Sequence, residues 1–186
     1  MAKQERKNFC SSFKVFKCAA QNDELRPAMN SVYFQNGYVY ATDAHMLVRA
    51  KITDISNFTY EEVALLEGKS IHAKLLKSVY SHNFVEVKAD GFHASDEKQG
   101  WEIVYLFNDE KTAPTPPNFE VILSKSEHAE LDKIGLKANL LSKLTSAIGC
   151  GDNTRLDFTG RSSQIKVSEI GNVLDIKGII MPMMID

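Results

Sequence analysis

The stretch SVYFQNGYVYAT, residues 31–42, decides the fold class of this chain. Aromatic and β-branched residues, which favour sheets, stand on both sides of Asn36-Gly37. An Asn-Gly pair accepts positive φ at both positions and is the strongest short hairpin signal. We therefore expect strands at Ser31–Gln35 and Tyr38–Thr42, and a third at 46–52. Because side chains alternate across a strand, one set of the hairpin aromatics should be buried and the other exposed.

Outward from this hairpin, a unit of one amphipathic helix and three strands occurs three times. Apolar residues at helical spacing predict helices from about residue 12, over 71–82 and over 139–148. A strand over 13–18 is an open alternative to the first helix, because Phe and Val also favour sheets. Gly149 and Gly151 should end the third helix. The expected core faces hold Phe13, Phe16 and Ala20, then Ile71, Leu75 and Val79, then Leu140, Leu144 and Ile148.

The strands of the second unit are expected at 84–88, 92–95 and 101–107, and those of the third at 155–159, 163–168 and 173–183. Between these units lies a stiff connector in which Pro114, Pro116 and Pro117 forbid helix and central strand. Residues 118–123 then suggest one more strand. The polar segment 124–130 is the candidate boundary between a domain over 1–123 and a shorter part over 131–186.

The composition is that of an ordinary globular protein, with 186 residues, 44% hydrophobic and 25% charged. No apolar run approaches the roughly 20 residues of a membrane span, and the charged N-terminus lacks the apolar core of a signal peptide. The three cysteines show no C-x-x-C spacing, so we expect neither a disulfide framework nor a zinc site. These features favour a reducing cytoplasm and give no reason to expect a cofactor.

The formal net charge is −2, so contact with nucleic acid would require local positive surface. Each predicted helix carries lysine on its polar side, and these side chains would converge if the three helices lay side by side. A row of flexible point charges suits phosphate contact without base readout. Lysine on an exposed helix is also the ordinary composition of a solvated surface. The candidate DNA-facing residues are Lys14, Lys17, Lys74, Lys77 and Lys143.

The tail GIIMPMMID, residues 178–186, is an apolar run with three methionines and a proline. Pro182 has no N–H to donate to a sheet, and methionine is flexible and recurs at surfaces that accept varied partners. The tail is therefore either a buried last strand or one wall of a peptide-binding groove.

Four segments together resemble the bacterial DNA polymerase III β subunit, the sliding clamp. They are ELRPAMNSVYF at 24–34, ATDAHML at 41–47, Pro117-Asn118-Phe119, and the Met-Pro-Met ending. Residues 8–123 resemble the middle of that family's three domains, and 131–186 the second half of the last. The resemblance implies an α+β DNA clamp fold built from units of one helix and three antiparallel strands. It also implies a ring that encircles duplex DNA, has no active site, and tethers polymerases and repair factors through a peptide groove.

Carried over by position, the resemblance implies groove residues from three segments of this chain. Ala44 stands where the family usually has glycine. Met46 and Met184 stand where it tends to have arginine, which should favour a more apolar ligand. The implied groove residues are Thr42, His45, Met46, Leu47, Pro117, Ile122, Ile179, Met181, Pro182, Met183 and Met184.

Three functions remain open on the sequence. The first is a reduced, non-catalytic clamp that contacts duplex DNA and recruits a polymerase or repair partner, with a homo-oligomer as one open form of assembly. The second is an adaptor or decoy that binds clamp-binding peptides without encircling DNA. The third is an enzyme using Asp43 and His45, or Cys150 as nucleophile. It is the least favoured, because no H-x-x-x-H, P-loop or G-x-S-x-G spacing occurs.

Overall fold

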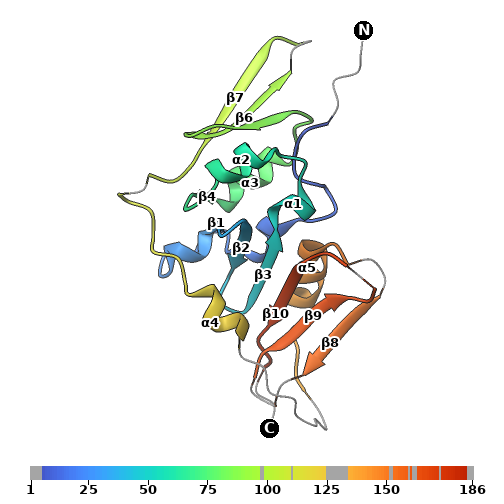
Figure 1. The fold of residues 1–186 in the computed structure, drawn as a ribbon. Coiled ribbons are helices and arrows are strands. Elements are labelled where there is room, and N and C mark those ends of the chain that lie inside the picture. Colours follow the sequence, from blue (N-terminus) through green and yellow to red (C-terminus); the bar gives the residue numbers. More distant parts are fainter. Residues whose placement is uncertain are drawn as a thin grey trace.

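The computed structural model describes residues 6–96, 99–109, 111–124, 134–150, 153–158, 160, 163–171 and 173–183. The fold is α+β, as predicted. Its strands form two antiparallel sheets, one of seven strands in the order β4-β1-β2-β3-β10-β9-β8 and one of three in the order β5-β6-β7 (Figure 1). Within these ranges, no helix has the length and apolar composition needed to cross a membrane.

The hairpin prediction is confirmed. β1 (Ser31–Gln35) and β2 (Tyr38–Thr42) pair with Gln35 opposite Tyr38, and the intervening Asn36 and Gly37 have φ of 53° and 75°. β3 (Met46–Lys51) follows in the same sheet, and Ile52 begins the short helix α1 (Ile52–Ile55).

The first predicted helix is wrong, and so is the strand alternative. The segment forms a single 3-10 turn, η1 (Val15–Cys18), without a side-chain hydrogen bond at its N-cap. The chain returns to extended backbone at Ala19. Because Val15, Phe16 and Cys18 are all buried, tertiary packing rather than helical periodicity fixes this segment. A second 3-10 turn, η2 (Pro27–Asn30), precedes β1.

The second predicted helix is too long at both ends. Ser70–His72 is a strand, β4, that pairs with β1, and helix α3 (Ala73–Val79) begins only after it. The buried face of the helix was predicted by counting from Ile71, but Ile71 belongs to the strand. The buried leucine of α3 is therefore Leu76, and Leu75, which was expected in the core, is exposed. Helix α2 (Tyr60–Leu65), with a Thr59–Glu62 capping box, was not predicted. The strands then follow as expected, with β5 at Val85–Val87, β6 at Gly91–Asp96 and β7 at Trp101–Leu106.

The third helix is confirmed as α5 (Ala138–Ile148), with Leu140, Leu144 and Ile148 buried. Gly149 ends it in the left-handed conformation at φ 71°, while Gly151 lies outside the described residues. Three strands follow. β8 (Thr154–Phe158) and β9 (Ile165–Glu169) lie close to their predicted ranges, whereas β10 (Ile176–Ile180) is three residues shorter at each end than the predicted 173–183.

The strand predicted over 118–123 is wrong, because this segment forms helix α4 (Phe119–Ser124). The side chain of Asn118 accepts a hydrogen bond from the backbone N–H of Val121 at 3.2 Å, as a capping residue does. Phe119 is buried against the sheet. The segment therefore buries its apolar side chain as a helix, without pairing with a neighbouring strand. Ser124 closes this helix, and the rest of the candidate boundary lies outside the described residues.

The seven-stranded sheet buries apolar side chains on both faces. On the helix face, α5 packs on β3 and β10, and η1 packs on β2, over the main core. On the opposite face, which we call the α4 face, a smaller cluster forms around Phe119. That cluster contains Tyr33, Tyr40, Leu47, Phe119 and Ile179.

Candidate peptide-binding surface and lysine face

The first and third units join in one sheet where β3 meets β10. The two strands are antiparallel, with Leu47 opposite Ile179, so segments far apart in the sequence lie side by side (Figure 1). Past β10, Met181 lies beside the β2–β3 turn, where its N–H donates to the carbonyl of His45 at 2.8 Å. The N–H of Met183 donates to the carbonyl of Gly135 at 2.9 Å. We call this region, from the β2–β3 turn to the tail and α4, the junction.

The β2–β3 turn is held by its own side chains. The Thr42 hydroxyl donates to the carbonyl of Met46 at 2.7 Å and accepts from the N–H of Ala44 at 3.0 Å. The Asp43 carboxylate accepts from the N–H groups of His45 and Met46 at 2.9 and 3.0 Å. Ala44 has a φ of 72°, a left-handed conformation that suits glycine and costs an alanine roughly 1–2 kcal/mol.

The structure brings most of the implied groove residues to the junction. Leu47 and Ile179 are buried together, Ile122 packs at the edge of their cluster, and Thr42 is buried at the end of β2. Exposed apolar surface lies next to them, since Met181 and Met183 are 41% and 43% exposed. The other implied residues are the exposed His45, the half-buried Pro117 and Pro182, and Met184, which lies outside the described residues.

Met46 does not contribute to the junction. It is 2% exposed and belongs to the main core on the helix face. Successive side chains of a strand point to opposite faces, so Leu47 reaches the α4 face and Met46 cannot.

The sequence reasoning missed the aromatic support beneath this surface. The rings of Tyr40 and Phe119 stack with centroids 4.7 Å apart, and the Tyr40 hydroxyl donates to Glu120 at 2.8 Å. Burial, and then the hydrogen bond to Glu120, raise the pKa of Tyr40. The expectation that one set of hairpin aromatics is exposed is wrong, because α4 covers Tyr33 and Tyr40 while the main core takes Phe34. The alternation of the aromatic side chains was visible in the sequence, but the packing of α4 over the second set was not.

An ion pair between the buried Arg49 and the half-exposed Asp175, next to the junction, was also missed. Arg49 of β3 donates to the Asp175 carboxylate at 2.5 Å, and its guanidinium carbon lies 4.3 Å from the ring centre of Tyr38. The Tyr38 hydroxyl donates to the same carboxylate at 2.6 Å. Burial opposes ionisation of Asp175, but the hydrogen bonds from Tyr38 and Arg49 outweigh it and lower its pKa. The pair ties β3 to the turn before β10.

The predicted DNA-facing lysines lie on the helix face. η1 packs against both α3 and α5, so the three lysine-bearing elements are neighbours. Lys14, Lys74, Lys77 and Lys143 are exposed and Lys17 is half-exposed. Of this group, Lys17 and Lys143 line one hollow of about 540 Å³, together with Asp43 and His45 of the β2–β3 turn.

Neither Cys150 nor the acidic and imidazole side chains form a site with the chemistry of an enzyme in the part of the chain that the structure describes. Burial raises the pKa of the Cys150 thiol, which disfavours the thiolate that a nucleophile needs. In the described part of the chain, no group of three or more His, Cys, Asp or Glu side chains is placed to hold a metal ion.

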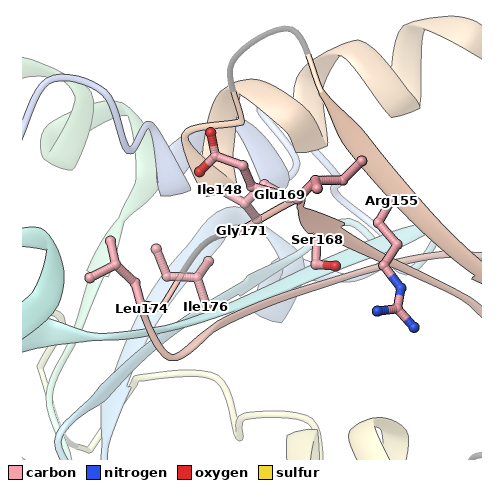
Figure 2. A pocket seen from close by; sticks show the side chains of 8 residues that line it. Ile148, Arg155, Ser168, Glu169, Gly171, Leu174 and Ile176 are labelled. Atoms are coloured by element: carbon pink, nitrogen blue, oxygen red, sulfur yellow. The ribbon is translucent and has the colours of Figure 1, made fainter.

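A second hollow, of about 260 Å³, lies beyond the C-terminal end of α5. Leu174 and Ile176 lie on one side of it and Arg155 on the other (Figure 2). None of the predicted site residues within the described ranges lines it.

Comparisons with known proteins identify the fold but no protein family or curated relative. No protein-family model and no curated protein matches the sequence. Among solved structures, the DNA polymerase III subunit beta of Borrelia burgdorferi matches with a TM-score of 0.59 at 13% identity, over 100% of this chain and 66% of that one. The beta clamp of H. pylori matches with a TM-score of 0.63 at 14% identity, over 100% and 68%. The sliding clamp of Pseudomonas aeruginosa matches with a TM-score of 0.60 at 11% identity, over 100% and 68%.

The chain has the DNA clamp fold. This confirms the fold expected from the resemblance, and the clamp-fold chain spans about two thirds of the length of these solved clamps. Within the clamp fold, the lysines lie on the helix face and the junction lies where β3 meets β10.

Proposed function

We propose that this clamp-fold chain is a non-catalytic, cytoplasmic protein that docks a polymerase or repair partner at the junction and contacts duplex DNA with the lysines of the helix face. The observation that carries the proposal is the pairing of Leu47 with Ile179 beside the exposed side chains of Met181 and Met183. In this proposal, residues 1–123 act as a complete clamp-like domain and 131–186 as a half-domain joined to it.

The junction has the chemistry that an apolar peptide needs. Its floor is rigid, because Leu47 and Ile179 are fixed by sheet pairing and by the cover of Phe119. Its rim is adaptable, because the exposed methionines can change rotamer around a ligand. An extended or helical peptide with apolar anchors is the expected ligand class.

The test of docking is fluorescence polarisation with a labelled clamp-binding peptide from a bacterial polymerase. We expect Met183→Ala combined with His45→Ala to weaken binding about tenfold or more, since anchor contacts carry most of the energy of such interfaces. Val173→Ala is the matched control, because Val173 is exposed apolar surface outside the junction. Equal affinity of wild type and the double variant for the peptide would mean that the peptide does not bind at the junction.

The test of DNA contact uses the exposed lysines of α3. Lys74→Glu with Lys77→Glu should weaken binding of a short duplex and make it less salt-sensitive, because fewer counterions are released. Lys177→Glu is the control, since Lys177 is exposed on β10 and, by strand alternation with Gly178, which contacts Leu144 of α5, lies on the α4 face and not on the helix face.

The alternative is an adaptor or decoy that binds such peptides and never encircles DNA. The net charge of −2 favours it. It predicts that the Lys74→Glu, Lys77→Glu variant keeps full function in a replication assay, while the junction variant loses it. Mass in solution at high protein concentration separates a homo-oligomer from a monomeric module.

A further inference from the structure

The hollow beside the β2–β3 turn joins the two candidate surfaces. It lies between the helix face and the turn, with Lys17 contributed by η1 and Lys143 by α5. Asp43 and His45 of the turn form another part of its wall, and Asp23 and Arg26 complete its charged lining. One cavity therefore holds lysines from the first and third units together with a residue implied in peptide docking.

The acidic groups of this hollow are already engaged. Asp23 forms an ion pair with Arg26 at 2.8 Å. The Asp43 carboxylate accepts two backbone N–H groups of its own turn. The ammonium groups of Lys17 and Lys143 have no hydrogen bond or ion pair with any other described residue. These two lysines are therefore the cations of the hollow that can bind a ligand. A phosphate group is the class of ligand that two lysine ammonium groups bind well.

The backbone of the β2–β3 turn contacts the residue that follows β10. The carbonyl of His45 accepts the N–H of Met181, while the side chain of His45 lines the hollow. The side-chain hydrogen bonds of Thr42 and Asp43 tie the turn into one unit. A ligand that fixes the turn from the hollow would therefore also fix the edge of the junction.

We propose that this hollow binds a backbone phosphate of duplex DNA between Lys17 and Lys143, and that its occupation strengthens peptide docking at the junction. The proposal rests on the proposed function. A phosphate held by both lysines links η1 of the first unit to α5 of the third, and these are the units whose strands form the junction. Fixing the β2–β3 turn, and through it Met181 at the edge of the junction, in advance lowers the cost of ordering the rim around the peptide, which is positive coupling.

The experiment measures the affinity of the labelled peptide with and without a saturating 20-base-pair duplex, at constant ionic strength. In wild type we expect an increase of about fivefold, at the lower end of usual coupling. In Lys17→Gln with Lys143→Gln, the ratio of the two affinities should fall to one. Inorganic phosphate in place of DNA should reproduce part of the increase in wild type and none in this variant, which separates a phosphate effect from an effect of duplex length.

The matched control removes the same number of charges from a neighbouring helix. Lys74→Gln with Lys77→Gln should need more DNA to saturate but keep the fivefold ratio, because neither residue lines the hollow. All lysines changed are at least partly exposed, and thermal unfolding checks that each variant folds.

The outcomes are distinct. If peptide and DNA both bind but the ratio is one in wild type, the coupling is wrong and the proposed function stands. A ratio that survives in Lys17→Gln with Lys143→Gln would place the coupling elsewhere and overturn the role of the hollow. If the peptide or the DNA does not bind at all, the proposed function itself fails.

Discussion

The two faces of the seven-stranded sheet are buried in different ways. The helix face packs against η1 and α5 in a continuous core of aliphatic and phenylalanine side chains. The α4 face is covered by one short helix, and its cluster uses tyrosines whose hydroxyls bond to the cover, such as Tyr40 to Glu120. The first arrangement holds the fold together. The second leaves apolar surface half-covered at the junction, as a docking site requires.

The largest expected effect comes from a matched pair of leucines. Leu144→Ala on the helix face should lower the free energy of unfolding by about 3–5 kcal/mol, because the closed core cannot collapse into the cavity. Leu47→Ala on the α4 face should cost about 2–3 kcal/mol, because the thinner cover can relax. Denaturant unfolding measures both. Equal losses would mean that the two faces are packed equally tightly.

The α4 face is also stabilised by the ion pair between Arg49 and Asp175, and Asp175→Asn tests its contribution. The change leaves the buried guanidinium of Arg49 without its carboxylate and should destabilise the protein by about 2 kcal/mol. Asp157→Asn is the control, since its partner Arg155 is largely exposed and an exposed pair contributes only about 0–1 kcal/mol. Thermal melts of the two variants should differ by several degrees, and similar melts would show that the Arg49 pair adds little.

Acid should weaken the ion pair between Glu62 of α2 and Lys7 of the N-terminal segment. Burial would raise the pKa of Glu62, but hydrogen bonds from Lys7 and from the N–H groups of Thr59 and Val87 outweigh it and lower the pKa below 4.5. The stability that ionised Glu62 contributes is therefore full above about pH 4.5 and is lost as the pH falls through the lowered pKa. Glu62→Gln should be less stable than wild type at pH 7, and the difference should shrink towards pH 3. A constant difference across that range would assign the effect to packing instead.

The smallest effect is a gain in stability. Ala44→Gly should relieve the left-handed conformation of the β2–β3 turn and stabilise the protein by about 0.5–1 kcal/mol, after the larger entropy of glycine in the unfolded chain is subtracted. Ala41→Gly, in the neighbouring strand, should destabilise instead. A loss of stability in Ala44→Gly would show that the turn carries no strain.

The implied groove followed the resemblance only where strand geometry agreed with it. Leu47 and Ile179 meet because β3 and β10 pair, which no pattern within either segment specifies. Met46 matched by position and still faces the core, because a strand turns alternate residues to opposite sides. Tyr40 and Glu120 were missed, because their contact depends on where α4 docks.

Elements with local signals could be predicted from neighbouring residues alone. Asn36-Gly37 specified the hairpin, and the spacing of Leu140, Leu144 and Ile148 with a following Gly149 specified α5. Long-range packing, in contrast, makes residues 15–18 a single turn and residues 119–124 a helix. Turn dihedrals and helical periodicity involve a few neighbouring residues, whereas η1 and α4 depend on what they bury. The hollow between Lys17 and Lys143 was also a tertiary result, because it exists only where η1, α5 and the β2–β3 turn come together.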